Sequence, residues 1–366
     1  MTRRAVVVMM VAAVLGLATP GAQSRSQSEL TRAGWDALNA GRPQEAAATF
    51  AEALKGDPPT PPLLLGAALA AHLQTRYEDA RQHLVAALGL DPSLLPASIL
   101  LGEVLYRSGD LDGAILVYEQ ALVKATDHPQ ISKKLEAWRK ELALHSRFGQ
   151  RFSDHFTVLF EGPTEAPLAQ HAVGVLEAAY WRIGTALGTY PVDVITVVLY
   201  TREQFRDVTQ SPEWAGGAFD GKIRVPVQGA LENSREFDRV LTHEFTHALV
   251  HSIAPRGVPT WLSEGLAVLF EGGDLTKKTA QVRDASSPLP LEQLEGSFAK
   301  LSPSQATLAY AQSAVAANAL VEQAGTTAVV SLLTDVGSGT SFAAAFARHI
   351  PIGLAEFQKK LWGNTP

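Results

Sequence analysis

Between residues 28 and 127, small and hydrophobic residues recur at intervals of 34 positions. The columns in register are Gly34, Ala68 and Gly102; Ala46, Ala80 and Ala114; Phe50, Leu84 and Tyr118; and Ala53, Ala87 and Ala121. Small side chains at fixed positions let paired helices approach closely, and Pro58 and Pro92, again 34 apart, follow the second helix of a pair. The pattern predicts three helix pairs, with one more amphipathic helix over 131–148 covering the end of the stack.

This period and these small positions resemble the tetratricopeptide repeat, with three repeats and a capping helix over 28–148. The array ends after the third repeat, because Thr126 stands where a proline is expected and Pro129 follows three residues later. The resemblance implies that the concave face of the array binds a protein partner or a peptide substrate. Scaffolding of the following domain is the alternative role.

After residue 150 the hydrophobic pattern alternates as it does in strands. We expect strands over 155–160, 194–200 and 222–227, with a helix over about 168–187 between the first two. Pro226 cannot donate to neighbours on both sides, so the third strand is expected at a sheet edge. Such an edge can hold extended substrate by main-chain hydrogen bonds, which would place 217–219 and 223–225 beside the reactive site.

Two helices with chemically distinctive residues follow, over 234–254 and 259–271. The first has an N-x-x-E start at Asn233 and contains the motif H-E-x-x-H from His243 to His247. The second carries Glu264 in the middle of an apolar segment, where a carboxylate needs a partner. A solvated helix with two ordinary histidines is the alternative interpretation.

His243 and His247 are four residues apart, so their imidazoles lie on one helix face and can bind one Zn²⁺. Glu264 would be the third ligand, leaving a fourth position open for water. Glu244 points about 100° away from His243 on the helix, where it can act as a general base without being a ligand. The spacing therefore predicts one zinc ion and a hydrolytic reaction.

The motif and its downstream glutamate resemble the glutamate zincins, the group of thermolysin and the zinc aminopeptidases. The string W-L-S-E-G-L-A over 261–267 is similar to the W-L-N-E-G-F-A string of the aminopeptidases. Val250 and Ile253 exclude the metzincin pattern, and the G-A-M-E-N segment that grips a substrate amino terminus is absent. Val268 stands where the thermolysin group has an aspartate that orients a histidine, so this orienting partner must come from elsewhere.

The order of the segments is similar to exported bacterial proteins of the "peptidase MA-like" group, in which tetratricopeptide repeats precede a metallopeptidase domain. The resemblance implies peptide-bond hydrolysis, with endopeptidase action expected. The segment from 289 to 366 is predicted to be helical, with breaks at Pro303, Gly325, Gly337 and Pro351.

Three residues outside the motif are candidates for a role at the site. Glutamate zincins commonly use a Tyr or His to stabilise the oxyanion, and Tyr310 is the only tyrosine after Glu264. Packing in a core helix is the alternative for Tyr310. His349 is a second candidate for that role, whereas His251 is expected to be a partly exposed helix-end histidine rather than a ligand.

Residues 1–24 have the pattern of a signal peptide, with Arg3 and Arg4 before an apolar run that is short for a membrane span. We therefore expect an exported protein, periplasmic or secreted, with no stable membrane span after cleavage. An uncleaved anchor is the alternative. The chain has no cysteine, so neither disulfides nor thiolate ligands are available. A net charge of −6 without a basic run argues against nucleic-acid binding.

These observations predict a mainly α protein with an α+β catalytic domain. An array over 28–148 precedes a zincin-like domain over 150–366, whose 150–230 part is rich in strands. The predicted function is zinc-dependent cleavage of an envelope or extracellular protein. The competing hypotheses are a repeat-based binding or assembly protein with a structural or inactive zinc domain, and a metallohydrolase that acts on a non-peptide amide.

Overall fold

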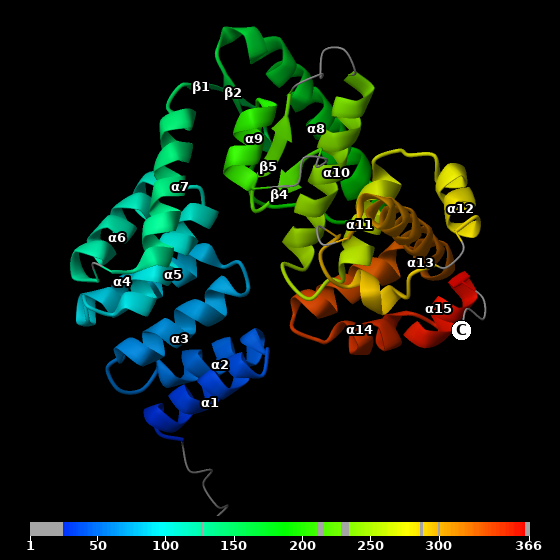
Figure 1. Cartoon of the computed structure of the whole chain (residues 1–366). Helices are drawn as coiled ribbons and strands as arrows, with labels where there is room; N and C mark the ends of the chain where they lie inside the picture. Colours follow the sequence, from blue (N-terminus) through cyan, green and yellow to red (C-terminus); the bar gives the residue numbers. More distant parts are fainter. Residues whose placement is uncertain are drawn as a thin grey trace, which may run out of the picture.

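The computed structural model describes residues 25–362, apart from 126, 211–215, 228–233, 286–287 and 299–300. The predicted signal peptide, Thr126 and Asn233 lie outside the described residues. Figure 1 shows an arc of helices on the left of the view, joined through α7 (Pro129–His145) and β1 (Phe148–Phe152) to a mixed second lobe. The architecture is mainly α with an α+β second domain, which confirms the predicted fold class.

The arc consists of three helix pairs and the capping helix α7. The pairs are α1 (Gln27–Asn39) with α2 (Pro43–Ala53), α3 (Pro61–His72) with α4 (Tyr77–Leu90), and α5 (Leu95–Arg107) with α6 (Leu111–Lys124). The 34-residue columns lie where paired helices cross. A Cβ added at Gly102 would lie 2.2 Å from the ring of Tyr118, and one at Gly34 would lie 2.5 Å from the ring of Phe50. The small residues therefore make room for the aromatic rings of the partner helices.

The second lobe contains a mixed sheet in the order β1-β2-β3-β5-β4. Its strands after β1 are β2 (Phe156–Glu161), β3 (Ile195–Tyr200), β4 (Ala218–Phe219) and β5 (Ile223–Pro226). The three central strands run parallel, whereas β1 and β4 pair antiparallel at the two edges. Helix α8 (Ala166–Leu187) connects β2 to β3 and packs on the sheet.

The expectation that the third predicted strand is a sheet edge was wrong. Strand β5 lies between β3 and β4, and the edge is the two-residue β4. Pro226 is accommodated because it is the last residue of β5, opposite Tyr200 of β3. Strand β4 reaches only Ile223 and Arg224, so no strand on that side needs an N–H from the proline.

Helices complete the second lobe. They are α9 (Arg202–Thr209), α10 (Ser234–Ile253), α11 (Thr260–Phe270), α12 (Leu275–Arg283), α13 (Pro303–Gly337), α14 (Phe342–His349) and α15 (Leu354–Trp362), with short 3₁₀ turns at Pro163–Glu165 and Leu291–Leu294. Helix α13 begins at Pro303, ends at Gly337 and is interrupted at Gly325, whose φ of 81° is non-helical. Within the described ranges, no helix combines the length and the hydrophobicity that crossing a membrane requires.

The repeat array contacts the second lobe through the fully buried guanidinium of Arg224 on β5. Its Nη1 donates to Glu141 Oε1 of α7 at 3.0 Å and to the Tyr200 hydroxyl of β3 at 2.8 Å. Its Nη2 donates to the Tyr106 hydroxyl of α5 at 2.9 Å, and its Nε donates to the carboxylate of Asp220. Each polar group that the interface buries here has a partner, as a buried charge requires.

The charges at this interface also control the ionisation of Glu141. Burial raises the pKa of its carboxyl, but the positive charges of Arg224 and Lys222 outweigh that effect and lower the pKa below its ordinary value.

A second contact lies at the other end of the array, where Gln44 Nε2 donates to the carbonyl oxygen of Gly337 at 2.7 Å. The array therefore touches the second lobe at both of its ends.

Candidate metal centre

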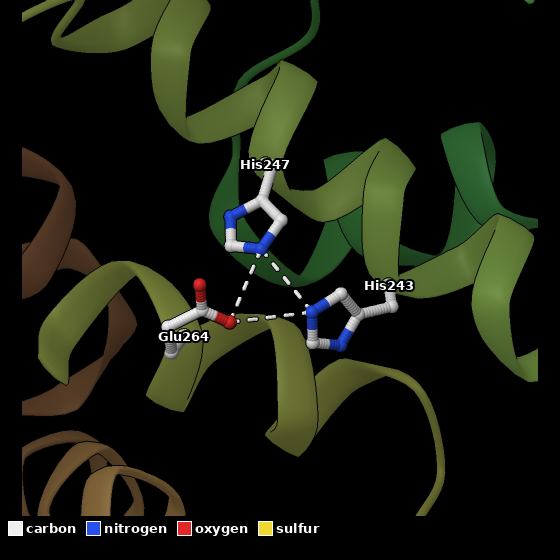
Figure 2. Close-up of side chains that lie close together, drawn as sticks. All are labelled: His243, His247 and Glu264. Carbon is white, nitrogen blue, oxygen red and sulfur yellow. Dashed lines mark hydrogen bonds and ion pairs between the residues drawn. The ribbon is translucent and has the colours of Figure 1, made fainter. Parts of the chain in front are cut away.

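Three side chains from two helices converge at one point of the second lobe. His243 and His247 project from the same face of α10, with their Nε2 atoms 3.2 Å apart. Glu264 of α11 places Oε2 at 3.3 Å from His243 Nε2 and at 3.4 Å from His247 Nε2. Figure 2 shows the three side chains pointing toward one another. Each of the three offers one ligand atom, and these atoms lie within 4.8 Å of one another.

The geometry of these three atoms fits a metal ion. Ligands bound at about 2.0 Å in a tetrahedral arrangement are about 3.3 Å apart, close to the separations seen here. Glu264 Oε2 is buried and accepts no hydrogen bond from the described residues. Two imidazole nitrogens and a carboxylate oxygen are the donors that Zn²⁺ accepts, and an orphaned carboxylate oxygen in such a place needs a cation.

The outer ring nitrogens of both histidines are held by partners that sequence analysis did not identify. His243 Nδ1 lies 2.8 Å from Glu271 Oε2, and Arg239 Nη1 donates to the same oxygen at 2.7 Å. His247 Nδ1 lies 2.9 Å from Ser263 Oγ. Such partners fix the ring orientation and the tautomer, which directs each Nε2 toward the centre. Glu271 lies seven residues after Glu264, about two helical turns, which is the sequence signal that could have found it.

The electrostatics of the centre favour a cation. Burial lowers the pKa of His243, but the carboxylates of Glu264, Glu271 and Glu244 outweigh burial and raise the pKa to about 10. Burial acts in the opposite direction on Glu264, and the two histidines overcome it and lower the pKa of that carboxyl. Without a metal ion, a proton on His243 would provide the positive charge that these carboxylates favour.

Glu244 lies beside the centre but outside the group of three ligands. Its side chain is 5% exposed, and burial is the main cause of its raised pKa. The backbone of Gly217 covers it so closely that a Cβ there would lie 2.6 Å from Glu244 Oε1. A carboxylate with a raised pKa next to a metal centre can accept and return a proton.

The three candidate residues outside the motif, Tyr310, His251 and His349, lie in different places. Tyr310 lines the same cavity as His243 and Glu244, and burial together with the nearby carboxylates raises the pKa of its hydroxyl. His251 lies further along that cavity, with its ring 5.3 Å from the ring of Phe219. His349 instead pairs with Asp335 at 2.8 Å and does not line this cavity.

The cavity over the centre has a volume of about 510 Å³ and is bordered on one side by Gly217–Phe219 of the β4 edge. A smaller cavity of about 230 Å³ adjoins it and shares Gly217, Glu244 and Tyr310.

The expectation that 223–225 also lie beside the centre was wrong. Because β5 is an interior strand, these residues are buried in the sheet, and Arg224 turns toward the repeat array.

The sequence profile of the Peptidase MA superfamily matches residues 176–364, just over half of the chain. The chain belongs to the Peptidase MA superfamily. Two tetratricopeptide-repeat profiles match residues 31–94 and 71–137, in the region of the helical arc. These matches confirm the predicted combination of repeats with a peptidase-type domain.

Two solved structures are similar to part of this Peptidase MA superfamily member. The first tetratricopeptide domain of Spaghetti (RPAP3), bound to an HSP90 peptide, is 21% identical, with a TM-score of 0.32, and covers 33% of this chain and 96% of its own. The Sgt2 tetratricopeptide domain from Aspergillus fumigatus is 22% identical, with a TM-score of 0.32, and covers 35% of this chain and 86% of its own. No curated protein sequence matches the chain.

Proposed function

We propose that this chain is a zinc-dependent peptidase that holds one zinc ion with His243, His247 and Glu264. The observation that carries the proposal is the convergence of these three ligand atoms next to Glu244, with Glu264 Oε2 buried and accepting no hydrogen bond in the described part of the chain. Membership of the Peptidase MA superfamily supports the same activity. A zinc ion in such a site supplies Lewis acidity and lowers the pKa of water.

The remaining chemistry falls to side chains of the cavity. Glu244 accepts a proton from the attacking water and returns it to the leaving amine, which its raised pKa favours. Tyr310 donates a hydrogen bond from its protonated hydroxyl to the carbonyl oxygen of the substrate as negative charge develops there. Glu271 and Ser263 are positioning residues, because they act on the reaction only through the two histidines.

The substrate main chain is proposed to lie along β4. This strand is the edge of the sheet, and its residues border the cavity over the centre. An extended peptide can add to such an edge through main-chain hydrogen bonds. We further propose that the repeats dock the substrate or a partner, and that the protein acts in the envelope or outside the cell, as the pattern of residues 1–24 suggests.

Glu244 separates this proposal from the hypothesis of a binding protein with a structural zinc site. A structural site has no use for a buried carboxylate that is not a ligand, and burying that charge without a direct partner is unfavourable. Cleavage of a peptide library, followed by identification of the products, distinguishes a peptidase from a hydrolase of other amides.

The test combines metal content with turnover. We expect residues 25–366 to contain one zinc ion per chain by elemental mass spectrometry, and Glu264→Ala to lose most of it. Glu244→Gln should retain the zinc and lose peptide cleavage by a factor of about 10² to 10⁴. Absence of zinc from the reconstituted wild type, or normal cleavage by Glu244→Gln, would contradict the proposal.

A further inference from the structure

A cavity of about 650 Å³ lies between the repeat array and the peptidase domain. The array contributes the segment from Thr75 to Asp79, which includes the start of α4, and the end of α5 at Arg107, whereas the peptidase domain contributes the end of α10. Phe219 and His251 line both this cavity and the one over the metal centre. The two cavities therefore share this pair of rings, and a polypeptide that extends beyond the centre on this side would approach the repeats.

Two arginines, one from each domain, face this junction. Arg256 follows α10 and lines the cavity over the metal centre, and Arg107 lines the cavity between the domains. Burial and then the positive charges of Arg107 and Arg256 lower the pKa of His251. Both arginines also act on His72 and Tyr77 of the array. Both guanidiniums thus lie near enough to these side chains, and to each other, for their charges to interact.

Neither arginine has an acidic counter-charge in the described part of the chain. Arg107 Nη1 donates only to the carbonyl oxygen of Asp220, at 2.7 Å, and Arg256 forms no ion pair there. Burial and the charge of Arg107 lower the pKa of Arg256, as expected of two cations that repel each other. An anion between them would relieve this repulsion.

The acidic residues around the cavity do not fill this role. Two of them already pair with other arginines, Glu78 with Arg81 and Asp79 with Arg76. Asp220, which precedes the lining residue Gly221, pairs with Arg224. Asp193 belongs to the loop before β3 and is not among the charges that act on His251. The chain as a whole carries a net charge of −6, so the positive junction is a local feature of the cleft.

We infer that the peptidase prefers polypeptides with acidic side chains on the repeat-facing side of the scissile bond, bound by Arg256 of the peptidase domain and Arg107 of the array. This inference rests on the proposed peptidase function and names the substrate class for the same site. From His247 to His251 is about one helical turn, about 6 Å, and an extended peptide advances about 3.3 Å per residue. Arg256 lies beyond His251, which places the acidic residue about two to four positions from the scissile bond.

Binding to an inactive chain tests the inference separately from catalysis. Zinc-loaded Glu244→Gln protein is titrated with two fluorescent ten-residue peptide libraries. One library carries Glu or Asp at three randomised positions, and the other carries Gln or Asn there. We expect the acidic library to bind about tenfold more tightly, and this ratio to fall as salt screens the charges. Because cleavage is not measured, a failure of the peptidase proposal appears only in the turnover assay.

Charge-removing variants then locate the preference. In the Glu244→Gln background, Arg256→Gln and Arg107→Gln should each reduce the ratio of the two affinities, and together they should abolish it. Arg32→Gln removes the same charge from an exposed position on α1, outside both cavities, and should leave the ratio unchanged. Circular dichroism and thermal unfolding establish that each variant is folded.

Three results would overturn the inference. They are equal affinity for both libraries, no binding of either library up to about 1 mM, and a preference that survives in the double variant. Among the described residues Arg256 forms no ion pair across the domain interface, so its single substitution keeps the test valid if Arg107→Gln weakens the contact with Asp220.

Discussion

Glu271 Oε2 lies 2.8 Å from His243 Nδ1, although Glu271 is the residue that directly follows the last residue of α11. The Glu271 side chain is 3% exposed and is also held by Arg239, so it cannot turn toward solvent without breaking both contacts. A carboxylate at this place makes the imidazole a better metal ligand and fixes its tautomer. Glu271, at the end of α11, thus provides the carboxylate that orients a histidine, which Val268 in the middle of the helix cannot provide.

Replacing Glu271 should weaken metal binding without removing a ligand. We expect Glu271→Gln to lower zinc affinity by about 10- to 100-fold, because the amide is a weaker partner for His243 Nδ1. Competition with a zinc chelator measures the change. Glu292→Gln, an exposed substitution on the Leu291–Leu294 turn, is the matched control and should keep the wild-type affinity. Unchanged affinity in Glu271→Gln would show that the contact does not support the metal site.

Gly217 should be intolerant of a single added methyl group. Its Cβ would lie 2.6 Å from Glu244 Oε1, so Gly217→Ala must displace the carboxylate or the β4 edge. We expect peptide cleavage to fall by about 10²-fold with zinc content unchanged, because misplacement of about 1 Å is enough for such a loss. Gly216→Ala is the neighbouring control, since its Cβ would meet only a methyl group of Val240, at 3.3 Å. Equal activity of the two variants would argue against Glu244 as the general base.

The interface around Arg224 should dominate the stability of the two-lobed chain. We expect Arg224→Met to lower the free energy of unfolding by about 3 kcal/mol, because buried Glu141 loses its closest counter-charge and keeps only Lys222 at 3.8 Å. Urea titration measures this loss. Arg42→Met breaks the pair with Glu45, whose two side chains are 53% and 54% exposed, and should change stability by about 1 kcal/mol or less. Similar losses in both variants would mean that the buried network is no stronger than a surface ion pair.

The same interface predicts how stability depends on pH. Burial lowers the pKa of His145 to about 4, and the charges of Lys222 and Arg224 act in the same direction against Glu141. In the unfolded chain this histidine takes up a proton near its ordinary pKa of 6.5, whereas the folded chain resists protonation until about pH 4. The unfolded state therefore binds more protons across this window, and stability falls as pH decreases from about 6.5 toward 4.

His145→Gln should remove part of this dependence. Its amide can still reach the Tyr200 hydroxyl, which lies 2.7 Å from His145 Nε2, but it does not titrate. Thermal unfolding at several pH values between about 4 and 7 should give a flatter profile for the variant than for the wild type. Parallel profiles would show that other groups cause the acid sensitivity.

The sequence was sufficient where local spacing determines geometry. A 34-residue period predicts paired helices because each repeat meets its neighbour in the same way, and the interval from His243 to His247 fixes one helix face. The pairing of Glu264 with that face also followed, since an apolar helix cannot otherwise hold a carboxylate.

The sequence is insufficient where long-range packing decides the position of an element or a side chain. The alternating pattern around Arg224 is the same for an edge strand and for an interior strand, so the position of β5 depended on a two-residue strand with little pattern of its own. Arg224 was expected beside the reactive site, and only the fold shows that its side chain is buried against the repeat array. Glu271 was missed because its partner lies on another helix, reached through the turn between α10 and α11.

The ligand group spans two helices, and this has a mechanical consequence. A metal held by His243, His247 and Glu264 would fasten α10 to α11 and close the chain between them into a loop. The sequence contains no cysteine, so no disulfide can cross-link the domain elsewhere. Helix α11 is also seated on α13 at Gly265, where a Cβ would lie 2.2 Å from the Ser313 carbonyl oxygen. One ion would therefore cross-link the domain. A chelator would loosen the packing of α10, α11 and α13 and would also stop the proposed reaction.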